Sequence, residues 1–301
     1  MHRRRLNHKL QKLLRQPEFF LAAHQPFRKN MYYFAGSLNM TAGIGISAFY
    51  HFRHAKHQLI FHLYNQLKQG LLKFRQGGFG ELDSFGIDTW GVDYGLLDKN
   101  GHLAGVPRSY RLGVQADIDA VLEKIPSEEL YSRTGIDTKL TFNTIYQLYR
   151  RLREEDAALQ IADTMLLTPD LLGYFLTGAK GTEYTIATTT QLYNPTTKDW
   201  DWETIRQLGL PEKIFTKIEK TGTVRGHLRP QLCEELGLNP AAFVAVGSHD
   251  TASAVAAIPG KGSFVCGVPE SQKPQDLWQI FDETAAQLLR QGVPVEELIH
   301  R

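Results

Sequence analysis

The apolar positions of this chain follow two kinds of repeat, and together they predict an α/β protein. Over residues 54–74 they recur at steps of three and four residues, which predicts an amphipathic helix. Stripes with the same spacing predict further helices near residues 118–125, 145–152, 162–176 and 202–208, the third of them broken at Thr168-Pro169. Short apolar runs bounded by polar turns lie between these stripes and predict strands.

A polar bend of sequence Asp-Thr-Trp-Gly, at residues 88–91, separates two of these short runs. Asn100 and Gly101 follow the second run and form a strong hairpin signal. We therefore expect a strand, a tight bend, a second strand, a turn and a third strand over residues 83–103. Gly91 would let the backbone of the bend approach a ligand closely.

The last clear strand leads directly into a helix. The apolar run of residues 243–246 ends in Gly247 and Ser248, and His249, Asp250 and a run of small helix formers follow. Because open α/β sheets bind ligands outside the carboxyl ends of their strands, Asp250 is placed to take a proton from a hydroxyl substrate. The alternative is that Asp250 only caps the following helix, since Asp is a favoured N-cap residue.

Composition is that of a soluble globular protein. The chain has 301 residues, of which 42% are apolar and 22% charged, enough for one large domain or two ordinary ones. Cys233 and Cys266 stand in unrelated contexts, so we expect no disulfide framework and a reducing, cytoplasmic setting. The least charged window, residues 31–50, is interrupted by polar residues and glycines, so we expect neither a membrane span nor a secretory signal.

Charge is unevenly distributed along the chain. Residues 1–76 contain 13 Lys and Arg residues, seven of the eleven histidines and a single acid, Glu18. Such an asymmetry is typical of a basic arm that binds nucleic acid or an anionic membrane. No recognised nucleic-acid-binding fold surrounds it, so we expect no nucleic-acid or membrane partner. His51, His54 and His57 share a helical spacing without an acidic or cysteine partner, which favours a solvated basic face over a metal site.

Common catalytic motifs are absent from the sequence. Neither the P-loop pattern nor the dinucleotide-binding glycine fingerprint occurs, and the glycine-rich stretch at 42–47 lacks the required third glycine. The run Ser248-His249-Asp250 is not a hydrolase triad, because adjacent residues on one backbone point in different directions and no nucleophile elbow is present.

Five segments, in order along the chain, resemble the rhamnulokinase branch of the FGGY carbohydrate kinases over about residues 57–265. They read GIDTWGVDYGLLD (86–98), FNTIYQL (142–148), PDLL (169–172), ATTTQL (187–192) and GSHDTASAV (247–255). Five motifs in series are far more specific than a single glycine pattern.

The resemblance implies an α/β, actin-like (ribonuclease H-like) ATPase fold, with a mixed sheet flanked by helices and an active site between two domains. It implies ATP- and Mg²⁺-dependent phosphorylation of L-rhamnulose, or a related ketose, at the 1-hydroxyl. Asp250 would be the general base, His249 and Thr251 would hold the sugar, and the Gly91 backbone would contact it from the opposite bend. Phosphoryl transfer of this kind needs mainly positioning, charge neutralisation and a base within reach.

The chain also departs from the family pattern. Residues 1–56 contain no counterpart of the family's first hairpin, whose Asp-x-Gly-Ala-Ser-Ser-Gly-Arg-like loop grips ATP phosphate, and the family's Tyr-Arg-Asp-x-Arg segment reads YRLGV at 110–114. Beyond residue 265 the second phosphate loop and second domain have no counterpart. We therefore divide the chain into an atypical basic segment (1–56), an FGGY N-terminal domain (57–259) and a truncated remnant of the C-terminal domain (260–301).

Three hypotheses about function follow. The first is a sugar kinase of the rhamnulokinase type, impaired because most ATP contacts are missing. The second is a non-catalytic sugar-binding remnant or a pseudogene product. The acid-poor, His-rich composition of residues 1–56 favours translation from a wrong reading frame, or a decayed gene, over an evolved basic arm. The third is a binding module that uses the basic arm on nucleic acid or membrane.

Overall fold

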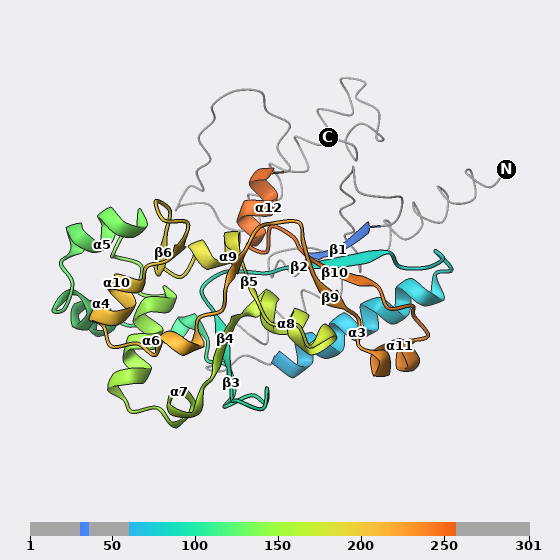
Figure 1. The fold of residues 1–301 in the computed structure, drawn as a ribbon, viewed down its shortest axis with the longest axis horizontal. Helices are drawn as coiled ribbons and strands as arrows, with labels where there is room; N and C mark the ends of the chain where they lie inside the picture. Colours follow the sequence, from blue (N-terminus) through green and yellow to red (C-terminus); the bar gives the residue numbers. More distant parts are fainter. Residues whose placement is uncertain (1–30, 36–59, 257–301) are drawn as a thin grey trace, which may run out of the picture.

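The computed structural model describes residues 31–35 and 60–256 of the chain, and within these ranges the fold is α/β (Figure 1). A mixed sheet carries helices on one face, and a second group of helices packs around a smaller antiparallel strand pair. The strands are β1 (Met31–Ala35), β2 (Ser84–Asp88), β3 (Tyr94–Leu97), β4 (Thr164–Leu167), β5 (Thr182–Glu183), β6 (Tyr193–Asn194), β7 (Asp199–Trp200), β8 (Ile218–Glu219), β9 (Thr223–His227) and β10 (Ala242–Ala245).

The helices, except the last, lie between these strands along the chain, with α4 to α7 following one another between β3 and β4. They are α3 (Ile60–Gln76), α4 (Gln115–Leu122), α5 (Ser127–Thr134), α6 (Thr144–Arg153), α7 (Ala157–Ile161), α8 (Thr168–Thr177), α9 (Tyr184–Thr188), α10 (Trp202–Gln207), α11 (Pro230–Leu236) and α12 (Asp250–Ala256), with short 3₁₀ turns η1 (Tyr110–Leu112) and η2 (Glu212–Ile214).

The main sheet has the strand order β1-β2-β10-β9. Strands β1, β2 and β10 run parallel, whereas β9 runs antiparallel to β10. The register places Ala242 opposite Ser84 and Phe243 opposite Phe85. Because β2 and β10 are parallel neighbours, their carboxyl ends reach the same edge of the sheet, and the segments that follow them start side by side.

One core lies between the sheet and helices α3, α8 and α11. The rings of Phe85 and Phe243 stack there with their centroids 5.3 Å apart, and both side chains are buried. Helix α8 approaches this pair closely at Gly173, where an added Cβ would lie 2.3 Å from the Phe243 ring. Glycine at this position therefore sets how near the helix can lie to the sheet.

A second core surrounds the antiparallel pair of β3 and β4. Successive side chains of a strand point to opposite faces. Met165 and Leu167 of β4 accordingly join the second core, while Leu166 between them joins the core under the main sheet. Strand β4 thus links the two cores, and the helices of the second core hold the segments that flank the bend after β2.

Two sequence predictions about elements are confirmed only in part. The helix expected over residues 162–176 is present only from its predicted break onward, as α8, which begins at Thr168, whereas the residues before the break form strand β4. The expected strand–turn–strand at residues 94–103 is present as β3, a turn and a single antiparallel bridge between Leu97 and Leu103, while β3 pairs along its whole length with β4. The predicted turn at Gly101 is present, with a φ of 82°.

Most other element predictions in the described residues are confirmed. The helix expected at residues 54–74 is α3, and the strand and helix around residue 246 are β10 and α12. A strand, β1, lies at Met31–Ala35, inside the segment for which the sequence showed only weak organisation. The rest of residues 1–56, including the three spaced histidines, and the predicted remnant at 260–301 lie outside the described residues.

Candidate active site

The bend after β2 and the junction after β10 meet in the structure. The Thr89 N–H donates to the Ser248 carbonyl at 3.0 Å, and the Asp250 N–H donates to the Thr89 carbonyl at 3.0 Å. These two bonds extend the parallel pairing by one bridge, between Thr89 and His249. The polar bend and the His249–Asp250 turn, predicted separately from the sequence, therefore form one site at the carboxyl edge of the sheet.

Asp250 begins helix α12, and its carboxylate is partly exposed, at 23% of the side-chain surface. Its Oδ1 accepts the Thr251 N–H at 2.6 Å and the Thr251 hydroxyl at 3.2 Å, and lies 3.7 Å from His249 Nε2. The bonds that the described residues make to this carboxylate fall on Oδ1, and the role of Asp250 as a base stays a prediction. The Oδ1 atom therefore satisfies the Thr251 amide in the first turn of α12, as a residue at a helix start can do.

The surroundings of this turn shift the acidity of both titratable groups. Burial raises the pKa of Asp250 above the usual value of a carboxyl, an effect that the neighbouring His249 and the Thr251 hydrogen bonds oppose. Burial lowers the pKa of His249, against the opposing effect of the Asp250 and Glu183 carboxylates. A carboxylate with a raised pKa is a stronger base, and a neutral imidazole can accept or donate a hydrogen bond to a sugar hydroxyl.

Gly91 lies where only a glycine fits. A Cβ added there would lie 2.7–2.8 Å from three side-chain atoms of Thr189, closer than real Cβ contacts allow. The close contact that the structure shows at Gly91 is with Thr189, which follows helix α9, whereas the sequence predicted a close approach to a ligand. A contact between the Gly91 backbone and a sugar stays a prediction.

The residue after Gly91 holds an unusual conformation. Val92 has a φ of 66°, which is a genuine outlier for a β-branched residue. Three hydrogen bonds fix it, and the two to its carbonyl are buried: its N–H donates to Thr189 Oγ1 at 3.0 Å, and its carbonyl accepts from Thr144 Oγ1 at 2.8 Å and Gln147 Nε2 at 3.1 Å. Strain held by surrounding bonds is common at functional sites, which agrees with a site at this bend.

The buried carboxylate of Asp93 organises the other side of the bend. Its Oδ2 accepts the Trp90 indole N–H at 2.8 Å, and its Oδ1 accepts the Tyr110 backbone N–H at 2.8 Å. The segment at 110–114, which departs from the family pattern, therefore lies next to the bend. Within it, the Leu112 carbonyl accepts from Arg150 at 2.7 Å, and Val114 is about half exposed, at 52%.

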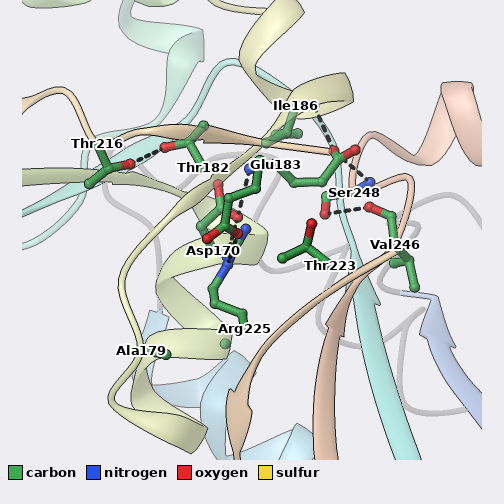
Figure 2. Close-up of polar contacts among 12 residues, drawn as sticks. Asp170, Ala179, Thr182, Glu183, Ile186, Thr216, Thr223, Arg225, Val246 and Ser248 are labelled. Atoms are coloured by element: carbon green, nitrogen blue, oxygen red, sulfur yellow. Dashed lines mark hydrogen bonds and ion pairs between the residues drawn. The ribbon is translucent and has the colours of Figure 1, made fainter. Parts of the chain in front are cut away.

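Sequence reasoning missed the residues that support the His249–Asp250 turn from below. Glu183 is fully buried, and its Oε2 accepts the Ser248 N–H at 3.1 Å (Figure 2). The same oxygen accepts the Thr185 hydroxyl at 2.6 Å, and that hydroxyl accepts the His249 N–H at 3.1 Å. An acid directly before a helix start was the available signal, because such a residue satisfies first-turn amides.

A buried ion pair lies beside Glu183. Asp170 Oδ1 and Arg225 Nη1 are 2.7 Å apart, and Arg225 Nε contacts Glu219 Oε2 at 2.7 Å. Asp170 and Arg225 point toward each other between α8 and β9 (Figure 2). Burial is the largest effect on Asp170 and raises its pKa to about 7, although the guanidinium lowers it.

Comparison with known proteins assigns the chain to a family. The model of the N-terminal domain of the FGGY family of carbohydrate kinases matches residues 81–257. The chain belongs to the FGGY family of carbohydrate kinases. Rhamnulokinase of Enterococcus faecalis is 42% identical over 201 residues, and rhamnulokinase of Bacteroides thetaiotaomicron is 40% identical over 204. Each alignment covers 66% of this chain. It covers 40% of the Enterococcus protein and 41% of the Bacteroides protein, so the FGGY chain spans about two-fifths of the length of these relatives.

Solved structures confirm the predicted actin-like fold of the FGGY chain. Xylulose kinase from Rhodospirillum rubrum superposes with a TM-score of 0.62 at 15% identity, covering 68% of this chain and 43% of the other. A ligand-bound xylulose kinase from Lactobacillus acidophilus also gives 0.62 at 15% identity, covering 67% and 41%. At such low identity these matches establish the fold and nothing finer.

Among the described residues, no group of three or more His, Cys, Asp or Glu side chains is arranged to hold a metal ion. The phosphate-gripping loops that the resemblance implies would fall before residue 57 and after residue 260, where the structure describes only strand β1. We therefore assign no described residue to ATP or Mg²⁺. Within the same ranges, no helix combines the length and apolar character needed to cross a bilayer.

Proposed function

We propose that this FGGY chain carries the sugar-binding and proton-accepting half of a rhamnulokinase-type site, which phosphorylates L-rhamnulose at its 1-hydroxyl with ATP. The observation that carries the proposal is the meeting of two strand ends: Asp250, partly exposed and raised in pKa, lies one hydrogen bond from the bend that contains Gly91. The names of the relatives supply the substrate. The absence of a disulfide framework favours a cytoplasmic setting.

In this mechanism ATP supplies the phosphoryl group, and the new bond joins the sugar 1-oxygen to phosphorus while the bond to ADP breaks. Asp250 Oδ2 accepts the hydroxyl proton as that bond forms. Thr251 holds Oδ1 through two hydrogen bonds, so the carboxylate is fixed with its other oxygen turned outward. His249 and the backbone at Gly91 would bind the remaining sugar hydroxyls. General-base assistance of this kind is worth about 10²–10⁴-fold in rate.

An assay of ATP-dependent L-rhamnulose phosphorylation tests the proposal, with Asp250→Asn as the variant. Asn keeps the shape of the side chain and removes the base, so turnover should fall at least about 100-fold while L-rhamnulose still binds. Asp119→Asn, an exposed acid on α4, is the matched control and should retain wild-type turnover.

The same experiment separates the proposal from its alternatives. Wild-type turnover no higher than that of Asp250→Asn would overturn the kinase function for this chain. Calorimetric binding of L-rhamnulose without turnover would instead support the non-catalytic sugar-binding hypothesis. Salt-sensitive binding of DNA or anionic liposomes that disappears on deletion of residues 1–56 would support the basic-arm hypothesis.

A further inference from the structure

We propose that Glu183 and Thr185 are positioning residues that hold the His249–Asp250 turn in the geometry required for proton transfer. This inference rests on the proposed function, because it concerns the carboxylate assigned there as the base. Neither residue touches the reacting atoms; both act through the backbone of the turn.

The connection is a two-step hydrogen-bond relay. The His249 N–H donates to Thr185 Oγ1 at 3.1 Å, and the Thr185 hydroxyl donates to Glu183 Oε2 at 2.6 Å. The same carboxylate oxygen accepts the Ser248 N–H directly, at 3.1 Å. Two consecutive amides of the turn, immediately before Asp250, are therefore fixed by one buried carboxylate.

Glu183 is well suited to this task, since its carboxylate is buried and the donors that the described residues offer to it are neutral. Oε2 also accepts the N–H groups of Thr185, at 2.8 Å, and Ile186, at 3.2 Å, while Oε1 accepts the Thr221 hydroxyl at 2.5 Å. Hydrogen bonds to a charged acceptor are about twice as strong as neutral ones. A carboxylate held by this many donors forms a rigid anchor for the turn (Figure 2).

The arrangement serves the site as well as the helix. The bonds to the Thr185 and Ile186 amides cap helix α9, which is a purely structural task. The bonds that reach Ser248 and His249 leave the helix and cross to the turn after β10. Because the Thr185 hydroxyl joins only the second set, substituting it separates positioning from capping.

Thr185→Val is therefore the decisive variant, because it keeps the branched shape and removes the relay hydroxyl. We expect kcat for L-rhamnulose phosphorylation to fall about 10- to 100-fold with KM changed less than about threefold, as expected when a reacting group is misplaced. The His249 amide should exchange with solvent about fivefold faster, the equivalent of one lost hydrogen bond.

Two companion variants show whether the hydroxyl itself is responsible. Thr185→Ser restores the hydroxyl and should return kcat and amide exchange to within about twofold of wild type. Thr188→Val lies on the same helix, where its hydroxyl bonds only to the Thr185 carbonyl among described residues, and should behave as wild type. Glu183→Gln removes the charge at nearly constant volume and should lower kcat at least as far as Thr185→Val.

The outcomes distinguish the two proposals. If wild type turns over and Thr185→Val matches Thr188→Val in kcat and in His249 exchange, the positioning role is refuted and the proposed function stands. If wild type shows no turnover, the proposed function fails, and with it the claim that the relay serves proton transfer. In that case faster His249 exchange in Thr185→Val alone would show that the relay still fixes the turn.

Discussion

Replacing Gly91 with alanine should damage the bend through one contact. The new Cβ would lie 2.7 Å from Thr189 Cγ2 and 2.8 Å from its Cβ and Oγ1. Forcing a methyl into a packed site costs about 1–3 kcal/mol. Thr189 must move, which weakens the hydrogen bond from the Val92 N–H to its hydroxyl and costs about 1 kcal/mol more. We expect Gly91→Ala to lower the free energy of unfolding by about 2–4 kcal/mol.

Urea denaturation at 25 °C measures this loss, with the change taken from the midpoint at constant m-value. Gly105→Ala is the matched control, because Gly105 is exposed and its added Cβ would meet only the Ala158 Cβ, at 3.3 Å. That control should change the free energy of unfolding by no more than about 0.5 kcal/mol.

A double-mutant cycle with Thr189→Ala tests whether the collision is the cause. Removing Cγ2 and Oγ1 relieves two of the three short contacts, so the double variant should be about 1 kcal/mol more stable than the two single losses predict. Additive losses, or a Gly91→Ala protein as stable as Gly105→Ala, would refute this account of the bend.

Two further substitutions test features away from the bend. Burial raises the pKa of Asp170 from 3.8 to about 7, so the folded protein binds a proton on this carboxyl more tightly than the unfolded chain does. This preference stabilises the fold fully below pH 4. It is lost as the pH rises through about 7, which lowers the free energy of unfolding by up to about 4 kcal/mol. Asp170→Asn should therefore flatten the dependence of unfolding free energy on pH between 4 and 7, and parallel profiles for the two proteins would contradict this. Lys198 is exposed with a φ of 58°, so Lys198→Gly should stabilise the protein by about 1 kcal/mol in thermal melts. Lys198→Ala should give no gain, and equal melting temperatures for the two variants would show that backbone conformation is not the reason.

Local patterns predicted helices better than they predicted strand partners. The spacing over residues 54–74 is helical by any measure, and helix α3 forms there. The run Met165-Leu166-Leu167 is apolar throughout, because β4 faces a core on each side. A short continuous apolar run cannot be assigned to helix or strand by periodicity, which is why this strand was predicted as helix. The pairing of β3 with β4 depends on contacts distant in sequence.

The candidate site could also be predicted only where it depends on local sequence, and not where it depends on which strands are neighbours. Asp250 could be predicted as a site residue because an apolar run followed directly by helix-forming residues is a local sequence pattern. That Asp250 would lie beside Thr89 depends on β2 and β10 being neighbours, which no local pattern contains. Glu183 was not predicted as a site residue, because the sequence does not distinguish a buried acid from an exposed one. Its burial and its hydrogen-bond donors are known only from the folded structure.

The position of β10 has a consequence for how the protein is made. It is the last of the described strands in the chain, yet it lies between β2 and β9 in the sheet. During synthesis β2 and β9 are both complete before their common neighbour emerges, so each presents an unpaired edge to other chains. Such edges favour aggregation of partly made chains. A translational delay that holds β10 inside the ribosome after β9 has emerged should therefore lower the soluble yield more than an equal delay after β10 has emerged.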